Sequence, residues 1–212
     1  MPPKAKYTRE EIVQIALDLV AARGIEALNA RNLAAALGTS TRPVFTAFKN
    51  MAELTGEVHA AAMKRFEDYA QRFDKDTPAF KSVGMHMILF AAEQPKLFQL
   101  LFMGDSEDSG SFESLFGRLG TTSGLCIELI QRDYGLNPEG AKLLFRSVWV
   151  YTYGICTLIA KGICRYNADE VSDMLSLEFR AMMGLVLSGK SSEKLEYEKG
   201  LSQQDFQKRF KT

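Results

Sequence analysis

The sequence offers little that an enzyme or a metal site would use. Its three cysteines, Cys126, Cys156 and Cys164, form no Cys-x-x-Cys pair and have no histidine at metal-ligand spacing. There is no Ser/His/Asp or Cys/His arrangement for nucleophilic catalysis, no evident pair of catalytic acids and no glycine-rich phosphate loop. The odd number of cysteines favours a reduced, cytoplasmic protein. We therefore expect no cofactor and no metal, and an all-helical enzyme is the least favoured interpretation.

Long apolar runs and strand patterns are also scarce. The start MPPKAKYTREE lacks the apolar segment of a secretion signal. The longest uncharged apolar run, residues 147–160, is shorter than the ~20 residues that cross a bilayer. Apolar residues recur instead at three- and four-residue steps. The sequence thus predicts an all-α protein that does not associate with membranes.

Positive and negative charges balance over the whole chain but not within its two parts. The chain holds 26 basic and 26 acidic side chains, so no overall field attracts DNA or anionic lipid. Residues 1–65 hold nine basic and six acidic side chains, a surplus of three. The remainder carries the compensating negative charge, which indicates that the two parts have different partners.

Cap and stop residues divide the first 50 positions into three short helices. Thr8, with Glu11 three residues later, is typical of a capping box that starts the first helix. The expected caps of the second and third helices are Asn29 and Ser40. The other boundary signals are two glycine stops and a proline that a first helical turn tolerates: Gly24, Gly38 and Pro43.

The remaining chain predicts longer helices. A fourth helix begins near Asn50 and continues to about Phe73, and the charged, turn-forming stretch 74–78 is the clearest boundary. Further helices are expected over 79–93, 95–103, 111–134, 138–164 and 169–188. We expect three units, residues 1–50, residues 51–190 and a polar tail over 191–212. The end of that tail either docks as a short helix or frays.

Residues 30–47 have the proportions of a helix-turn-helix, a motif whose second helix enters the DNA major groove. We expect Val44, Phe45 and Phe48 to pack inward. Arg42 is the expected base reader because its forked donors match the two acceptors of guanine, whereas hydroxyl groups suit phosphate. The candidate DNA-binding residues are Arg31, Thr39, Ser40, Thr41, Arg42, Thr46, Lys49 and Asn50.

A set of characteristic positions extends over residues 8–54 without a gap. They are Thr8–Ile12, Ala16–Leu17, Arg23–Gly24, Arg31–Ala34, Gly38–Ser40, Phe45, Phe48 and Glu53–Leu54. In these positions the chain resembles the TetR family of bacterial transcriptional regulators. The resemblance implies a three-helix helix-turn-helix DNA-binding domain over residues 1–50. It also implies an all-helical ligand-binding and dimerisation bundle over residues 51–190.

Three positions depart from the family pattern. The family usually has tyrosine at Phe45, histidine at Ala47 and lysine at Met51, and the resemblance links all three to phosphate contacts. Lys49 and Asn50 are placed to substitute for the missing lysine. We therefore expect binding to double-stranded operator DNA through a different set of contacts.

The second half resembles a subgroup of the family with Trp-x-x-x-His-Gly on its eighth helix. The corresponding segment here is Trp149–Gly154, in which Tyr153 stands at the histidine position. Residues 93–103 are similar to the sixth-helix region of that subgroup. Any ligand role of the subgroup histidine is therefore in question for this chain.

Aromatic and methionine side chains share inward-facing stripes in the second half. Most such residues form ordinary core, but a bundle rich in them repacks readily around a small apolar or amphipathic effector. Arg146 either holds a ligand carboxylate or pairs with an acid on a neighbouring helix. The candidate ligand-binding residues are Met85, Leu89, Phe98, Phe102, Phe116, Leu119, Arg146, Trp149 and Tyr153.

The segment 147–160 is apolar on nearly all faces, so something must cover it. The resemblance implies a homodimer through helices eight and nine, the segments 138–164 and 169–188, with Gly154 and Gly162 allowing close approach. We expect a repressor that a small effector releases from its operator. The alternative is a DNA-binding regulator without a small ligand that responds to a partner protein.

Overall fold

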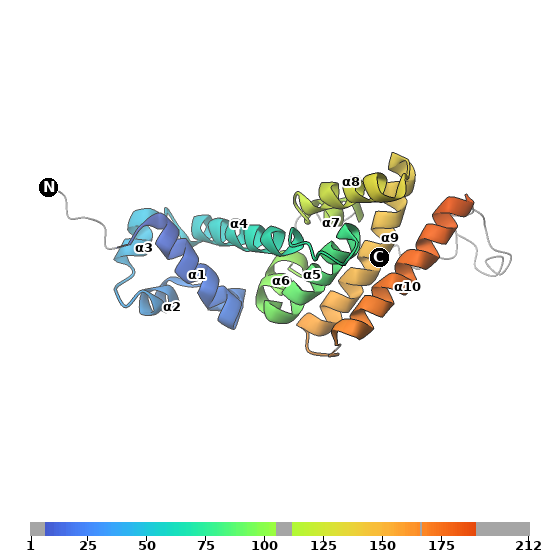
Figure 1. Cartoon of the computed structure of the whole chain (residues 1–212). Coiled ribbons are helices and arrows are strands. Elements are labelled where there is room, and N and C mark those ends of the chain that lie inside the picture. Colours follow the sequence, from blue (N-terminus) through green and yellow to red (C-terminus); the bar gives the residue numbers. More distant parts are fainter. Residues whose placement is uncertain (1–6, 105–111, 166, 190–212) are drawn as a thin grey trace, which may run out of the picture.

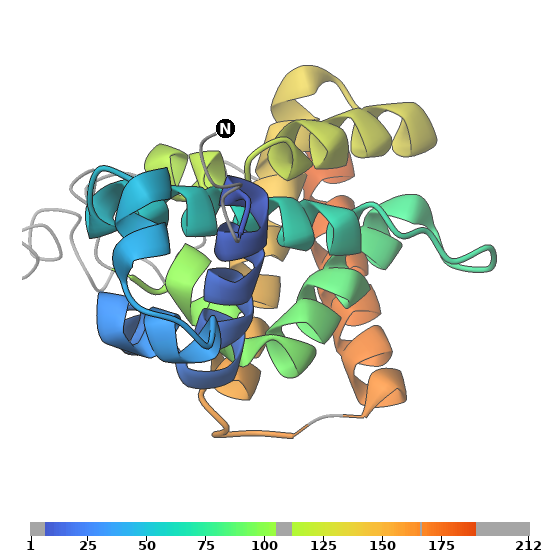
Figure 2. The ribbon, with the colours of Figure 1, turned by 90° about the vertical axis from the view of Figure 1, so that its left-hand side faces the viewer.

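The computed structural model describes residues 7–104, 112–165 and 167–189, and all regular secondary structure in these ranges is helical. The chain forms two parts joined by one long helix (Figure 1). Three N-terminal helices lie at one end, and a helical bundle lies at the other. Figure 2 views the molecule from the first end, with the three short helices in front of the bundle. The predicted all-α fold is confirmed.

The N-terminal part contains α1 (Arg9–Arg23), a single 3-10 turn η1 (Ile25–Ala27), α2 (Ala30–Ala36) and α3 (Arg42–Ala47). The predicted capping box is present, because Thr8 Oγ1 accepts from the Glu11 N–H and the Thr8 N–H donates to Glu11 Oε2. One side chain or more from each α-helix enters a shared core. Its members include Ile12, Ala16, Val20, Leu33, Leu37, Val44 and Phe48.

Helix α4 (Met51–Ala70) runs from the three short helices to the bundle (Figure 1). Asn50 caps it, since Asn50 Oδ1 accepts from the Glu53 N–H at 2.9 Å. Leu54 and Val58 complete the N-terminal core, and Phe66 enters the core of the bundle. The helix ends at Ala70 rather than at the predicted Phe73, which lies exposed in the following turn.

The bundle consists of α5 (Ala79–Glu93), α6 (Pro95–Phe102), α7 (Phe112–Gly117), α8 (Thr122–Tyr134), α9 (Pro138–Ala160) and α10 (Ala168–Ser188). Helix α9 packs against α5, α6, α8 and α10 and so forms the centre of the bundle. Edge-to-face, tilted and stacked aromatic pairs connect α4 to α9, and we call these rings the ring chain. The ring pairs are Phe66–Phe102, Phe98–Phe102, Phe98–Tyr153, Trp149–Tyr153 and Phe116–Trp149.

Two predicted helices differ from the observed ones. The segment 111–134 is two helices, because the chain turns at Gly117–Thr121, where Gly120 has a φ of +57°. Leu119 fixes this turn, since its side chain is only 1% exposed. The segment 138–164 ends at Ala160, and Gly162, with a φ of +69°, lies in the turn beyond it. Gly162 therefore lies outside the helix that was expected to contain it.

Helix α9 is long and apolar enough to cross a membrane by length and composition, with a mean hydropathy of 1.4 in its most apolar window. Of that window, 44% is buried by the rest of the chain, and a core helix passes the same test. The predicted tail over 191–212 and most of the predicted loop at 104–110 lie outside the described residues.

Candidate functional site

The turn between α2 and α3 is set by local backbone and side-chain bonds. Asn29 Oδ1 accepts from the Asn32 N–H at 3.0 Å and caps α2. The helix ends at Ala36, and Gly38 in the turn beyond it has a φ of +60°, a conformation that a side chain would oppose. The Thr39 N–H donates to the Ala34 carbonyl at 3.0 Å, which closes the turn. This geometry fixes the direction in which α3 leaves α2.

The start of α3 differs from our prediction. Thr41, rather than Ser40, occupies the N-cap position, and its side chain makes no capping bond. Ser40 Oγ accepts instead from the Arg42 N–H at 3.4 Å. Pro43 lies in the first turn of the helix, where its missing N–H leaves no partner unpaired. The exposed hydroxyl groups at this helix start remain accessible.

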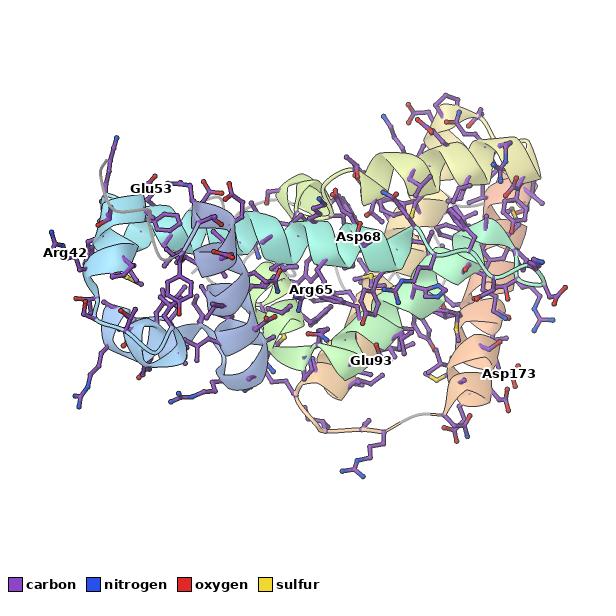
Figure 3. All side chains as sticks on the ribbon, turned by 60° about the vertical axis from the view of Figure 1, so that its left-hand side comes forward. Arg42, Glu53, Arg65, Asp68, Glu93 and Asp173 are labelled. Carbon is purple, nitrogen blue, oxygen red and sulfur yellow. The ribbon has the colours of Figure 1, made fainter. Side chains whose placement is uncertain are left out.

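The outer face of α3 is exposed and lies at the end of the molecule farthest from the bundle, with Arg42 pointing outward (Figure 3). Val44 and Phe48 are buried, as expected, but Phe45 is 50% exposed, so the prediction that it packs inward is wrong. The short helix turns Phe45 away from α1 and onto the same face as Arg42. Of the remaining candidate DNA-binding residues, Thr39 is half-buried and the others are exposed: Arg31, Ser40, Thr41, Thr46, Lys49 and Asn50.

The helix-turn-helix segment carries only positive charge. No acidic residue occurs from Ala27 to Ala52, whereas Arg31, Arg42 and Lys49 all lie within it. These three basic side chains are exposed. The surplus noted for residues 1–65 is therefore concentrated at the outer end of the molecule, where a polyanion can reach it.

Arg9 fixes the position of α3 and was missed by the sequence analysis. Its guanidinium donates to the Ala47 carbonyl at 2.8 Å, pairs with Glu53 at 2.9 Å and Glu57 at 2.8 Å, and lies over the Phe48 ring. It therefore joins the end of α3 to α1 and α4. The Lys49 N–H and then Arg9 hold the pKa of Glu53 below its ordinary value. A detectable signal was the pair of acids four residues apart on α4.

A second candidate site lies in the bundle, where α5, α8, α9 and α10 line a partly open cavity of about 420 Å³. Its wall is largely apolar and aromatic and includes Val83, Met87, Leu119, Phe145, Val148 and Trp149. Burial raises the pKa of the Cys126 thiol, also in the wall, to about 12, so this thiol is neutral at physiological pH. A space of this size is within the range of small-molecule sites.

Some polar groups of the cavity wall have no partner. Trp149 Nε1 and Thr122 Oγ1 are buried and find no hydrogen-bond partner among the described residues. Thr152, equally buried in the same wall, donates from its hydroxyl to the Val148 carbonyl at 2.8 Å. Leaving a buried polar group unpaired costs about 1–3 kcal/mol, so these two atoms call for an explanation.

The candidate ligand-binding residues divide among several places. Leu119 and Trp149 line the cavity. Phe98, Phe102 and Phe116 are buried in the ring chain, and Tyr153 donates from its hydroxyl to the Phe102 carbonyl. The others lie at separate surface hollows, Met85 and Leu89 beside the α9–α10 turn and Arg146 between α9 and α10. Residues of the cavity that were not predicted include Lys81, Thr122 and Arg180.

Helix α4 has bonds to both candidate sites. At its first turn, Glu53 pairs with Arg9 of α1. Farther along α4, Arg65 (labelled in Figure 3) pairs with Asp18 of α1 at 3.3 Å. At the other end Glu67 Oε1 accepts from the Thr121 N–H at 2.9 Å and from its hydroxyl at 2.7 Å. Thr121 directly precedes Thr122 of the cavity wall. Helix α4 is therefore bonded both to the N-terminal helices and to the residue that precedes the cavity wall.

The comparison with solved structures identifies the fold. One match is a Mesorhizobium loti protein assigned to the TetR family of transcriptional regulators, with a TM-score of 0.56 and 17% identity, over 84% of this chain and 95% of that one. Another is a TetR-like transcriptional regulator from a Rhodococcus species, with a TM-score of 0.58 and 17% identity, over 87% and 100%. No family model and no curated protein matches this sequence. The chain has the fold of these two regulators.

Proposed function

We propose that the chain is a TetR-type transcriptional regulator that binds operator DNA as a homodimer and releases it when a small molecule occupies the bundle. One observation carries the proposal. The second helix of a helix-turn-helix presents Arg42, Thr41 and Thr46 outward, within a segment that has basic residues and no acids. Arg42 reads guanine, Phe45 contacts thymine methyl groups, and Lys49 and the hydroxyl groups contact phosphate.

The proposed dimer covers apolar surface that the single chain leaves exposed. Leu143 and Val150 on α9 are exposed, as are Leu177, Leu185 and Leu187 on α10. Gly154 and Gly184 lie on the exposed sides of the two helices with open space around them. Pairing α9 and α10 with the same helices of a second copy is self-complementary and presents two recognition helices to one palindromic operator.

The proposed effector enters the cavity, and the response passes along α4. Glu67 connects α4 to the start of α8, and Arg9 connects it to the end of α3. A shift of α4 changes the separation of the two recognition helices and weakens operator binding. The coupling must be reciprocal, so operator DNA weakens effector binding by the same factor. We expect the output to be repression.

The decisive experiment selects bound sequences from a random double-stranded DNA library with the purified full chain. The expected result is a palindromic site with half-sites about one helical turn apart, roughly 34–36 Å. The Arg42→Ala variant should enrich a site with one degenerate position. Enrichment of no sequence by the wild-type protein, or a protein that remains monomeric at micromolar concentration, would overturn the proposal.

A further inference from the structure

We propose that the cavity binds an apolar carboxylic acid that carries a second, uncharged oxygen acceptor. This inference rests on the proposed function, because it names the class of effector for that site. Three features carry it. They are the apolar wall, the unpaired groups at Trp149 and Thr122, and an unneutralised ammonium at Lys81.

The wall requires a ligand with an apolar and preferably aromatic body. Rings of Phe80, Phe145, Trp149 and Phe179 contribute to it from three helices, and Met87 supplies a flexible thioether. A methionine side chain adapts its shape around an apolar ligand. Gly84 also lines the wall, and a β-carbon there would contact Leu175 at 3.4 Å. A strongly polar ligand such as a sugar would find too few partners on these surfaces.

The unpaired groups require an acceptor on the ligand. The indole nitrogen of Trp149 is a donor only, so the partner it lacks must be an oxygen or nitrogen lone pair. Thr122, in the first turn of α8, adds a hydroxyl to the same wall, and its hydrogen can rotate toward an acceptor. A ketone, ether or ester oxygen accepts from a donor of this kind without adding charge to a buried site.

The charged groups require a single negative charge on the ligand. The ammonium of Lys81 donates to Ser172 Oγ at 2.6 Å and Ser176 Oγ at 2.8 Å, and no ion pair involves it within the described part of the chain. One of its three donors is therefore open. Arg180 lies on the same wall, and Asp173 is its one carboxylate. Arg180 and Asp173 are both exposed, so water screens their charges, and half-buried Lys81 is the cation that a ligand carboxylate would neutralise.

The test uses three compounds that differ in one group each. They are 3-benzoylbenzoic acid, its amide 3-benzoylbenzamide, and 3-benzylbenzoic acid, in which a methylene replaces the ketone. Isothermal titration of the full chain should show the keto acid binding roughly tenfold or more tightly than either relative. If the amide binds as tightly as the acid, or if none of the three binds at about 1 mM, the proposal is wrong.

The single tryptophan provides a second measurement. Its indole N–H gives one cross-peak in a ¹H–¹⁵N spectrum, and a new hydrogen bond should move the proton resonance downfield. The ketone compounds should produce that shift, and 3-benzylbenzoic acid should not. An identical response to the ketone and the methylene compound would remove the acceptor from the proposal.

Variants test which cation, Lys81 or Arg180, contacts the ligand carboxylate. Lys81→Met keeps the aliphatic stem and should weaken the keto acid roughly tenfold without changing the affinity for the amide, and Lys81→Arg should restore most of the loss. Arg180→Gln tests the second cation in a protein that keeps the serine contacts of Lys81. Unchanged acid affinity in both variants would overturn the assignment. Failure of the proposed function would look different, because the acid would then bind while the chain selected no DNA sequence.

Discussion

The two ends of α4 use their polar groups in opposite ways. At the helix-turn-helix end, Asn29 and Asn50 cap helices and Arg9 is bonded to three partners, while the side chains of Arg42 and Lys49 face solvent. At the bundle end, Trp149 and Thr122 keep polar atoms buried and unpaired. The first arrangement suits a ligand met at the surface, and the second suits a ligand that enters the interior. The difference indicates which end is preformed and which gains bonds on binding.

The largest effect should come from removing the dimer that joins two helix-turn-helix ends. Leu177→Asp or Val150→Asp places a charge on surface that the proposed interface buries. Operator affinity should fall about 100-fold or more, because the second half-site is no longer held by a linked unit. Sedimentation and fluorescence anisotropy measure the two consequences. Phe73→Asp is the control, because it places the same charge on an exposed apolar side chain between α4 and α5, outside the proposed interface. An equal loss of operator affinity in that variant would argue against this interface.

The next effect concerns the outer face of α3. Arg42→Ala should cost roughly 1–3 kcal/mol in operator binding and relax the preference at one base position. Affinities for an operator series with single base changes measure this. Arg132→Ala is the control, because Arg132 is exposed on α8 and, among the residues that the structure describes, pairs with its neighbour Asp133. Uniform weakening across the whole series would assign Arg42 to phosphate instead.

Lys49 should behave differently from Arg42. Lys49→Ala should weaken all sequences evenly and reduce the slope of log affinity against log salt by about one unit. A salt titration of the wild-type and variant proteins measures that slope. An unchanged slope would mean that the exposed Lys49 side chain stays clear of the DNA.

A smaller effect is expected where the two ends are joined. Glu67→Ala removes the acceptor for both Thr121 bonds, so an effector should still bind but should shift operator affinity less, by about 0.5–2 kcal/mol. Anisotropy with and without 3-benzoylbenzoic acid measures the coupling. Asp68→Ala, the neighbouring exposed acid on α4 (Figure 3), is the control. If both variants retain full coupling, the signal reaches α3 by another route, such as the packing of α1 on α6.

The smallest effect concerns stability and has an unusual sign. Thr122→Val removes a hydroxyl that has no partner, so the ligand-free protein should become more stable by about 1 kcal/mol. Thr152→Val removes a hydroxyl that is bonded to Val148 and should bring no such gain. Thermal unfolding of the two variants measures the difference. Equal shifts would show that the Thr122 hydroxyl is satisfied in solution.

The boundaries of the N-terminal helices could be predicted because local residues set them. Thr8, Asn29, Gly38 and Asn50 act within four residues of their own positions, and each is found where the pattern placed it. The inward packing of Phe45 was predicted wrongly, because a six-residue helix has room to bury only one face. The role of Arg9 could not be predicted from local patterns, because its acidic partners lie more than forty residues away along the chain.

Most of the cavity wall could not be predicted for a related reason. Inward-facing aromatic residues look alike in a sequence whether they fill a core or line a space. Phe98 and Phe102 pack into the ring chain, whereas Phe80 and Phe179 line the cavity, and only the packing of α5 against α10 separates the two groups. The break at residues 117–121 did have a local signal in its two glycines, which the helical periodicity around it outweighed.

The turn at Gly120 is a position at which any substitution is strained. A β-carbon at this position would lie 2.6 Å from Glu67 Oε1, and its φ of +57° disfavours any side chain. Every missense change of a glycine codon adds such a carbon. A single nucleotide substitution there should displace the flexible Glu67 carboxylate from Thr121, and a selection for cells that no longer respond to the effector should recover changes at this codon.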